Sequence, residues 1–440
     1  MKRFIWKNLN PAEKTDALAR PQGLTDPALL KSVVQIMTQI KSGGDKALLN
    51  LTKKFDGVDV NTLKITNDEM QQAWRDLPKS QRKAINTAKK NIETFHTAQI
   101  PEDIVVETMK GVSCRRESRP IETAGLYVPG GSAPLVSTLL MLAVPAKVAG
   151  VRRRVVITPP GKDGKINSAI LAAAYRCKVT DLFIGGGAQA IGALAYGTET
   201  IPKCDKIFGP GNAYVAAAKS LAAQEAGGPA VDMPAGPSEA MVVAGEDANP
   251  VFVASDLLSQ AEHDPLAQVI CIASSDKVAD AIKVQIKAQI ETLPRRKIAM
   301  ASLAKSRMVI ANERMDIIDI INRYAPEHLI LQVKRAENFV PAIRNAGSIF
   351  LGPWTPESAG DYASGTNHTL PTYGAARAYS GVTLESFIKY ISVQKITRKG
   401  LEALGPSIET LAKMESLEAC LLYTSPSPRD RTRSRMPSSA

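Results

Sequence analysis

Three of the four histidines in the chain lie in short polar segments of the kind that carry chemistry. These segments are residues 259–263 (SQAEH), 325–329 (APEHL) and 365–368 (GTNH), and residues 357–361 (ESAGD) form a further polar segment. Imidazole titrates near neutral pH and also binds zinc, and the neighbouring carboxylates and amides are further possible ligands. The pattern therefore predicts an enzyme that uses a metal.

The first segment offers two side chains at helical spacing. Gln260 and His263 are three positions apart, so on a helix they would face the same way. Zinc accepts an amide oxygen and an imidazole nitrogen, and Asp361 could add a carboxylate. Taken alone this spacing is a weak signal, because a histidine in the core or at a helix cap is more common than a ligand. The metal interpretation depends on several such segments occurring together.

Glu327 and His328 form an adjacent acid and base directly after Pro326, which suits a loop or a helix start. Neighbouring side chains on a helix diverge, so the two groups would act on different atoms. Burial could tune the pKa of either group toward the working pH of a general base. A helix cap with a surface histidine is an equally open interpretation. His96 has no polar segment around it, and we expect it to be structural.

The intervening sequence alternates strands and helices. Residues up to 99 look helical, with an apolar stripe along 30–40 and a helix start at Asp26–Pro27. From Gly125 onward we expect strands at residues 123–128, 154–158, 181–184, 206–208, 240–244, 268–273 and 307–311. Strands and helices at this spacing predict parallel sheets with right-handed crossovers and ligands at the carboxyl ends of the strands. Residues 384–419 are expected to form short helices.

Glycine turns follow several of these strands. Residues 185–189 and 209–212 would each expose backbone N–H groups at a helix start, where phosphate binds, although each could equally be a tight turn without a ligand. No G-x-G-x-x-G dinucleotide motif is present. Tyr127 could stack on an adenine or nicotinamide ring, or could be an ordinary half-buried aromatic residue. The polar loops 234–239 and 360–368 are open to the same two interpretations, as functional loops or as surface connections.

Composition limits the class of protein. A chain of 440 residues suggests roughly two to four domains. The net charge of +12 is dispersed and no nucleic-acid-binding motif accompanies it, so we expect no nucleic-acid partner. No stretch approaches the ~20 apolar residues of a membrane span, and five scattered cysteines suit a reducing cytoplasm. Residues 421–440 are Ser-, Pro- and Arg-rich and look foreign to the rest, as a disordered tail or a junction sequence.

Seven motifs, in one order, resemble those of the histidinol dehydrogenases. They are residues 125–131 (GLYVPGG), 186–190 (GGAQA), 209–212 (GPGN), 233–239 (MPAGPSE), 255–263 (SDLLSQAEH), 326–328 (PEH) and 358–362 (SAGDY). The resemblance extends from near the start of the chain to about Ala419. It implies a cytoplasmic, zinc-dependent and NAD-linked four-electron oxidation of L-histidinol through L-histidinal to L-histidine, in histidine biosynthesis.

The resemblance also implies roles for individual residues. His328 matches the base that takes the hydroxyl proton in the first oxidation, and Glu327 matches the residue that activates water in the second. The zinc ligands implied are Gln260, His263 and Asp361, and the zinc holds the substrate by its imidazole and amine. The NAD contacts implied are Tyr127, Gln189 and Asn212, and further substrate-side positions are Ser238, His368 and Glu415. No cysteine lies in a polar motif with a base, so an activated water suits the second oxidation better than a cysteine nucleophile.

The fold implied is α/β, with two Rossmann-like, incompletely doubly wound domains and small helical end segments that are exchanged in a homodimer with a shared active site. We expect an N-terminal segment (1–24), a first α/β domain with the zinc and catalytic residues (25–124 with 238–381), a second, NAD-binding α/β domain (125–237) and a C-terminal helical segment (382–420).

The chain departs from the family at one ligand. The family's fourth zinc ligand is a histidine near the carboxyl terminus, reached across the dimer interface. Residues 414–419 (MESLEA) follow the family's lead-in, but the next residue is Cys420, and the foreign-looking tail begins directly after it. A cysteine thiolate can bind zinc. The alternative hypothesis is that the family's terminus, with its histidine, is replaced here and that catalysis is impaired.

Two other classes of function remain open from the residues alone. A zinc hydrolase could use Glu327 with a metal-bound water, but the H-E-x-x-H spacing of close ligands is absent. A binding module without catalysis is the third interpretation. Dependence on NAD separates the dehydrogenase from both.

Overall fold

The fold is seen in a computed structural model that describes residues 1–21, 27–130, 134–234 and 236–417. The chain divides into two compact units, one formed by residues 1–100 with 121–387 and the other, in the described part of the chain, by residues 101–120 with 388–417. The first unit contains two six-stranded sheets, and the second contains a three-stranded sheet.

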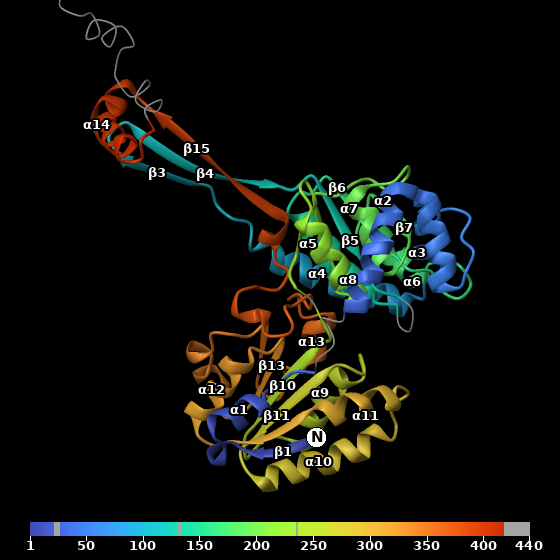
Figure 1. Cartoon of the computed structure of the whole chain (residues 1–440). Coiled ribbons are helices and arrows are strands. Elements are labelled where there is room, and N and C mark those ends of the chain that lie inside the picture. Colours follow the sequence, from blue (N-terminus) through green and yellow to red (C-terminus); the bar gives the residue numbers. More distant parts are fainter. Residues whose placement is uncertain (22–26, 131–133, 235, 418–440) are drawn as a thin grey trace, which may run out of the picture. The chain divides into compact units, whose positions relative to one another are not determined.

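The first sheet is wholly parallel, with the order β1-β12-β11-β10-β13-β14. Its strands are β1 (Lys2–Ile5), β12 (Arg307–Ile310), β11 (Gln268–Ala273), β10 (Glu239–Ala244), β13 (His328–Gln332) and β14 (Ser348–Leu351). One face packs on α9 (Pro250–Ala261), α10 (Asp276–Ile290) and α11 (Arg296–Lys305). The other packs on α1 (Pro11–Ala17) and α12 (Arg314–Tyr324) (Figure 1). Because both faces are covered, β10 and β11 are buried at every residue.

The second sheet has the order β2-β7-β6-β5-β8-β9 and is parallel except at β2. Its strands are β2 (Lys64–Ile65), β7 (Asp181–Ile184), β6 (Arg153–Thr158), β5 (Thr123–Tyr127), β8 (Lys206–Phe208) and β9 (Ala230–Val231). One face packs on α2 (Pro27–Asp56), α7 (Gly187–Tyr196) and α8 (Ala213–Gln224). The other packs on α3 (Asn67–Asp76), α4 (Lys79–Thr97), α5 (Val136–Val148) and α6 (Ser168–Arg176).

The α/β class with parallel sheets is confirmed, and each of the seven expected strands is present to within a residue of its expected ends. Strands β13 and β14 were missed, and for β13 the reason is that Pro326 and the polar pair after it favoured a loop or helix start. His328 is instead the first residue of β13. Asp361 was expected in a loop and lies on the short helix α13 (Glu357–Tyr362).

The grouping of the amino-terminal residues differs from the expected division. Helices α2, α3 and α4 and strand β2 pack with the sheet of residues 123–231, and not with the sheet of residues 239–351. The apolar stripe of α2, with Val33, Ile36 and Ile40 buried, contacts α7 on that second sheet. Residues 2–5 form β1 at the edge of the first sheet, where they pair with β12. Amphipathic periodicity shows that a face is buried but not which sheet buries it.

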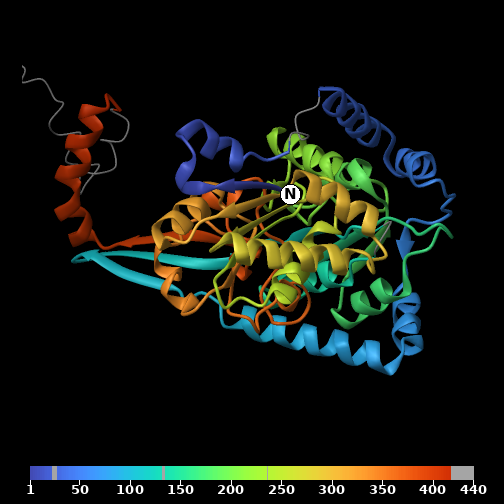
Figure 2. The same ribbon diagram turned by 90° about the horizontal axis from the view of Figure 1, so that it is seen from below.

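The second unit is built on β3 (Ile104–Met109), β4 (Val112–Pro120) and β15 (Ile388–Ile396), which form an antiparallel sheet in the order β15-β4-β3, followed by α14 (Arg398–Met414) (Figure 2). The expectation of short helices throughout 384–419 was therefore wrong for residues 388–396. Their sequence, IKYISVQKI, is rich in β-branched and aromatic side chains that favour a strand. Glu415 caps the carboxyl end of α14, whereas Cys420 and the tail 421–440 lie outside the described residues.

Short 3₁₀ helices complete the described elements: Trp6–Asn8, Ala336–Asn338, Val340–Ala342, Ala375–Arg377 and Leu384–Phe387. Among the described helices, none combines the length and the apolar character needed to cross a membrane.

Candidate active site

A cavity of about 470 Å³ brings most of the sequence-predicted site residues together. Its lining includes Asn212, Ser238, Gln260, His263, Glu327, His328, Asp361 and His368. The residues from the second sheet follow the carboxyl ends of their strands, as Pro129 and Asn212 do after β5 and β8. Those from the first sheet lie at the amino ends, since Ser238 precedes β10 and His328 begins β13. The cavity thus lies at the carboxyl ends of the strands in the second sheet, as expected for ligand sites, but at the amino ends of the strands in the first sheet.

His328 is held at the start of β13 by a contact of its Nδ1. Its Nδ1 lies 3.1 Å from the carbonyl oxygen of Glu239, and because a carbonyl only accepts, Nδ1 carries a proton. Its Nε2 lies 3.3 Å from Asp361 Oδ1 without hydrogen-bond alignment. The ring is 3% exposed, so the Glu239 carbonyl fixes the orientation in which Nε2 faces the cavity.

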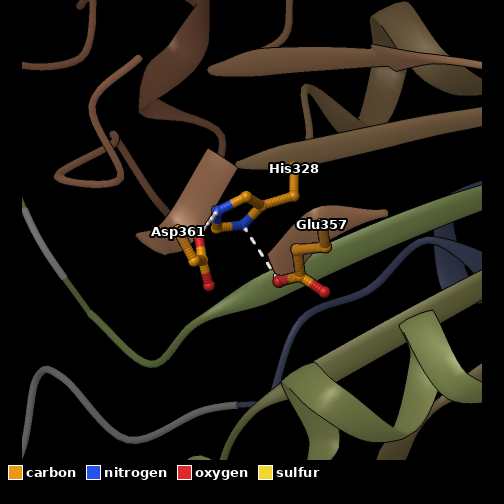
Figure 3. Close-up of side chains that lie close together, drawn as sticks. All are labelled: His328, Glu357 and Asp361. Carbon is orange, nitrogen blue, oxygen red and sulfur yellow. Dashed lines mark ion pairs between the residues drawn. The ribbon is translucent and has the colours of Figure 1, made fainter. Parts of the chain in front are cut away.

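Three carboxylates surround this imidazole, and Figure 3 shows two of them, Glu357 and Asp361. Glu357 Oε1 lies 3.7 Å and Glu327 Oε2 3.6 Å from His328 Nδ1, and Asp361 lies at Nε2. Burial opposes charging of the His328 ring, but the carboxylates outweigh burial and raise its pKa well above the ordinary value. Burial raises the pKa of Glu357 to about 8, although His328 acts in the opposite sense. For Asp361, His328 outweighs burial and lowers the pKa.

Glu327 is positioned mainly by the first sheet. Its Oε2 accepts a hydrogen bond of 2.7 Å from the backbone nitrogen of Glu239, and its own carbonyl accepts from Ser348 at 2.9 Å. The side chain is 5% exposed and lines the cavity. The adjacent residues Glu327 and His328 therefore both reach the same cavity, because the first lies just before β13 and the second begins it. The expectation that they diverge, as neighbours on a helix do, does not apply here.

Gln260 and His263 lie at the end of α9. Gln260 is on the last turn of the helix and is buried, and His263 lies beyond the helix end, where its backbone nitrogen bonds to the Gln260 carbonyl at 3.2 Å. Both side chains line the cavity with Asp361. The His263 imidazole is close enough to Asp361 to act electrostatically on it.

His368 also lines the cavity, and both of its ring nitrogens have a contact. Its Nδ1 lies 2.9 Å from the Asp361 carbonyl oxygen, and its Nε2 lies 3.1 Å from Thr138 Oγ1 on α5. Burial lowers the pKa of His368, so the neutral ring is favoured. In that form Nδ1 donates to the carbonyl and Nε2 accepts from the Thr138 hydroxyl.

Of the three residues expected to contact NAD, one lines the cavity and two do not. Asn212 lines the cavity, but its side chain also caps α8 by accepting from the backbone nitrogens of Tyr214 and Val215. Tyr127 is 5% exposed, and its hydroxyl accepts a bond of 3.2 Å from the Gly187 nitrogen. Gln189 lies buried on α7, and neither Tyr127 nor Gln189 is among the described residues that line this cavity.

Two structural interpretations from the sequence agree with the structure. His96 is 1% exposed, and its Nδ1 lies 2.8 Å from the Ile92 carbonyl within α4. Cys177 and Cys271 are buried, and burial raises the pKa of each thiol to about 12. Neither thiol is suited to act as a nucleophile.

The comparisons with known proteins identify the family. The profile of the family described as histidinol dehydrogenase matches residues 19–421. The chain belongs to the histidinol dehydrogenase family. It is 48% identical over 415 residues to the histidinol dehydrogenase of Colwellia psychrerythraea, covering 94% of this chain and 95% of that protein. It is 49% identical over 404 residues to that of Bacteroides fragilis, covering 92% and 94%.

A solved structure agrees with these relatives. The crystal structure of histidinol dehydrogenase from Elizabethkingia anophelis matches with a TM-score of 0.93 and 46% identity, covering 99% of this chain and 98% of that chain. The chain is thus an enzyme of a family of oxidoreductases in histidine biosynthesis, and the resemblance drawn from the seven motifs is confirmed.

Reasoning from the sequence missed two residues of this histidinol dehydrogenase site. Glu357 lies in one of the polar segments but received no role, and it is 1% exposed beside His328. Thr138, which contacts His368, lies in an apolar helix that the pattern marks only as buried. A carboxylate four positions before Asp361 on a helix was a usable signal for Glu357, whereas no local signal indicated Thr138.

The polar atoms at the centre of the site fit a cation. His328, Glu357 and Asp361 each offer one ligand atom, and these atoms lie within 4.8 Å of one another. Within the described part of the chain, His328 Nε2, Glu357 Oε1 and Asp361 Oδ1 are buried without a hydrogen-bond partner. Buried polar atoms are rarely left unpaired, so this group of atoms beside the cavity is suited to a positive ligand.

Proposed function

We propose that this protein oxidises L-histidinol through L-histidinal to L-histidine in the cytoplasm, with zinc and NAD. The observation that carries the proposal is the convergence of Glu327, His328 and Asp361 with Gln260 and His263 on one cavity. Family membership supports the reaction, and the geometry supports the separate role proposed for each residue. Zinc would supply a fixed positive centre that orients the substrate through its imidazole and amine, and NAD would supply the hydride acceptor.

Gln260, His263 and Asp361 are proposed to hold the zinc. They come from two elements, α9 with its end and α13, and Asp361 Oδ1 is one of the buried unpaired atoms. The cluster of His328, Glu357 and Asp361 offers a competing ligand set that shares Asp361. We favour the first set because it leaves His328 Nε2 available to the substrate hydroxyl, and a base needs that free nitrogen.

His328 is proposed to accept the hydroxyl proton in the first oxidation. The Glu239 carbonyl keeps a proton on Nδ1, and Nε2 faces the cavity. Nε2 would be the accepting atom once zinc on Asp361 offsets part of the negative charge that otherwise favours the protonated ring. Glu357, beside Nδ1, favours the charged ring that forms when the proton arrives. The triad of carbonyl, imidazole and carboxylate thus both orients the base and stabilises its product.

Glu327 is proposed to activate the water that attacks the aldehyde in the second oxidation. Its Oε2 is occupied by the Glu239 nitrogen, which leaves the other carboxylate oxygen for the water. Ser238, His368 and Glu415 are proposed as substrate-side positions, and Ser238 and His368 line the cavity. Tyr127, Gln189 and Asn212 remain the proposed NAD contacts, all near the carboxyl ends of strands in the second sheet.

A homodimer with exchanged end segments is part of the proposal, together with Rossmann-like winding of the two α/β domains. The second unit exposes a set of large apolar side chains on β3, β15 and α14: Ile104, Val105, Val106, Ile391, Leu411 and Met414, at 44–76% exposure. Its only described apolar residues in the core are Val112 and Ala412. A surface of this kind is expected to be covered by another chain. The shared active site would then receive Glu415 from the second copy.

The test is the formation of NADH from NAD when the zinc-loaded protein meets L-histidinol. We expect two NADH for each histidinol consumed and L-histidine as the product. A His328→Asn variant should lose oxidation of both histidinol and histidinal, whereas Glu327→Gln should lose mainly the oxidation of histidinal. Unaltered NAD with a zinc-loaded, dimeric protein would contradict the proposed function.

The role of Cys420 requires a paired measurement. Cys420 is proposed as a possible substitute for the family's histidine ligand, and the same assay should be run on a version whose residues from 420 onward carry a family-like, histidine-bearing helix. If only the version with the histidine-bearing helix turns over, the residues from 420 onward are what prevents activity in this chain. Equal turnover by both would show that Cys420 or water completes the zinc site.

A further inference from the structure

Glu239, at the start of β10, holds both proposed catalytic residues through its backbone. Its nitrogen donates to Glu327 Oε2 at 2.7 Å, and its carbonyl oxygen accepts from His328 Nδ1 at 3.1 Å. Any movement of this one residue would therefore displace Glu327 and His328 together. The contacts that hold Glu239 in place therefore influence the positions of both proposed catalytic residues.

The side chain of Glu239 is fixed by an arginine from the amino-terminal segment. Arg20 donates from Nε to Oε1 at 2.5 Å and from Nη2 to Oε2 at 2.9 Å, and the two side chains are 15% and 2% exposed. The backbone nitrogen of Tyr373 also donates to Oε1, at 3.1 Å. A bidentate pair of this kind constrains both the position and the orientation of the carboxylate.

The same arginine reaches the turn that leads into Glu327. Arg20 Nη2 donates to the carbonyl oxygen of Tyr324 at 2.7 Å and contacts that of Ala325 at 3.4 Å. These are the last carbonyls of α12, which ends at Ala325 in a left-handed conformation two residues before Glu327. The guanidinium also lies 3.9 Å from the centre of the Tyr324 ring. One side chain thus ties the start of β10 to the approach to β13.

The side chains of Arg20 and Glu239 make no hydrogen bond to Glu327 or His328; only the Glu239 backbone does. Neither residue is among the described residues that line the cavity, and the amino-terminal segment contributes none of them. We propose that Arg20 is a positioning residue for the chemistry of Glu327 and His328, acting through the Glu239 carboxylate and the Tyr324–Ala325 carbonyls. The inference rests on the catalytic roles proposed above, but the geometry it predicts is independent of them.

The test compares Arg20→Met with Arg20→Lys and with a matched control, Arg3→Gln. Arg3 lies in the same amino-terminal segment and pairs with Asp276 and Asp280 at the surface of the first sheet. We expect Arg20→Met to lower kcat roughly 10–100-fold with KM for histidinol nearly unchanged, since small misplacements of catalytic groups act mainly on the rate. Arg20→Lys should recover part of kcat, and added guanidinium should partly rescue an Arg20→Ala variant. Arg3→Gln should leave kcat unchanged.

A second readout does not require turnover. The chain has four histidines, so imidazole nitrogen resonances can be assigned by single substitutions. Arg20→Met should shift the Nδ1 resonance of His328 and leave that of His96 unchanged, and Arg3→Gln should change neither. An unshifted His328 signal, or an unchanged kcat in an active parent, would overturn the inference. An inactive parent whose His328 signal still responds to Arg20→Met would count against the proposed function alone.

Discussion

Lys219 and Asp232 form an ion pair that is almost completely removed from solvent, with side chains 4% and 1% exposed. The pair encloses Gly209, since Asp232 Oδ2 accepts from the Gly209 nitrogen at 2.8 Å and Lys219 donates to the Gly209 carbonyl at 3.0 Å. Gly209 opens the turn before Asn212, a proposed NAD contact that lines the cavity. Loss of the pair should therefore affect both the stability of the second sheet and the position of the turn that leads to Asn212.

Removing the charge of Asp232 should be costly. An Asp232→Asn substitution leaves Lys219 buried without a counter-ion, and we expect a loss of roughly 3–5 kcal/mol in the free energy of unfolding, measured by denaturant titration. The apparent Kd for NAD should also rise. The matched control is Asp247→Asn, because Asp247 pairs with Lys334 at 61% and 81% exposure, and such a surface pair contributes little to stability. Equal losses in the two variants would contradict the structural role of the buried pair.

Gly209 itself should not tolerate a side chain. Its φ is +124°, and an added Cβ would lie 2.1 Å from the backbone oxygen of Tyr127. We expect Gly209→Ala to destabilise the fold by more than about 3 kcal/mol, because backbone must shift. Gly57 has a φ of +74° with nothing within 4 Å of its added Cβ. Gly57→Ala should then cost only about 1 kcal/mol for the left-handed conformation. Thermal or denaturant unfolding of the two variants measures the difference, and similar values would argue against the close approach.

His96 should make the fold sensitive to acid. Burial lowers its pKa in the folded protein, so the unfolded chain binds a proton more readily. Above the unfolded pKa of about 6.5, His96 is neutral in both states and does not lower the free energy of unfolding. As the pH falls below that value, the unfolded chain takes up the proton and the free energy of unfolding decreases. In His96→Gln, the free energy of unfolding should decline less steeply between about pH 7 and pH 5. Parallel curves for the variant and the parent would mean that His96 is protonated in the folded state as readily as in the unfolded one.

Zinc occupancy should distinguish the two possible ligand sets. If Gln260, His263 and Asp361 hold the metal, His263→Asn should lower the zinc content measured by atomic absorption at limiting zinc. His328→Asn should retain the metal and lose only turnover. The reverse pattern would favour the cluster of His328, Glu357 and Asp361.

Removal of zinc by a chelator should abolish turnover, and added zinc should restore it, because the ligand atoms remain in place on α9, directly after α9 and on α13. The same occupancy assay applied to Cys420→Ala tests the fourth position. An unchanged zinc content there would exclude Cys420 as a ligand and leave the rest of the site assignment intact.

The sequence alone determined the class of fold, the location of seven strands and most of the residues that meet in the cavity. Continuous apolar runs such as residues 268–273 mark buried parallel strands, and polar segments such as 259–263 stand out against them, since both signals are local. Family motifs added the roles of these residues. Features that depend on neighbours along the chain could therefore be predicted from local sequence patterns.

Tertiary structure decided what depends on distant partners. The stripe of α2 did not show which sheet would bury it, and residues 2–5 gave no sign of pairing with β12. The contact of Arg20 with Glu239 joins residues 219 positions apart. The site also uses the amino ends of one sheet and the carboxyl ends of the other. Such pairings come from packing complementarity between whole elements, and no window of sequence contains both partners.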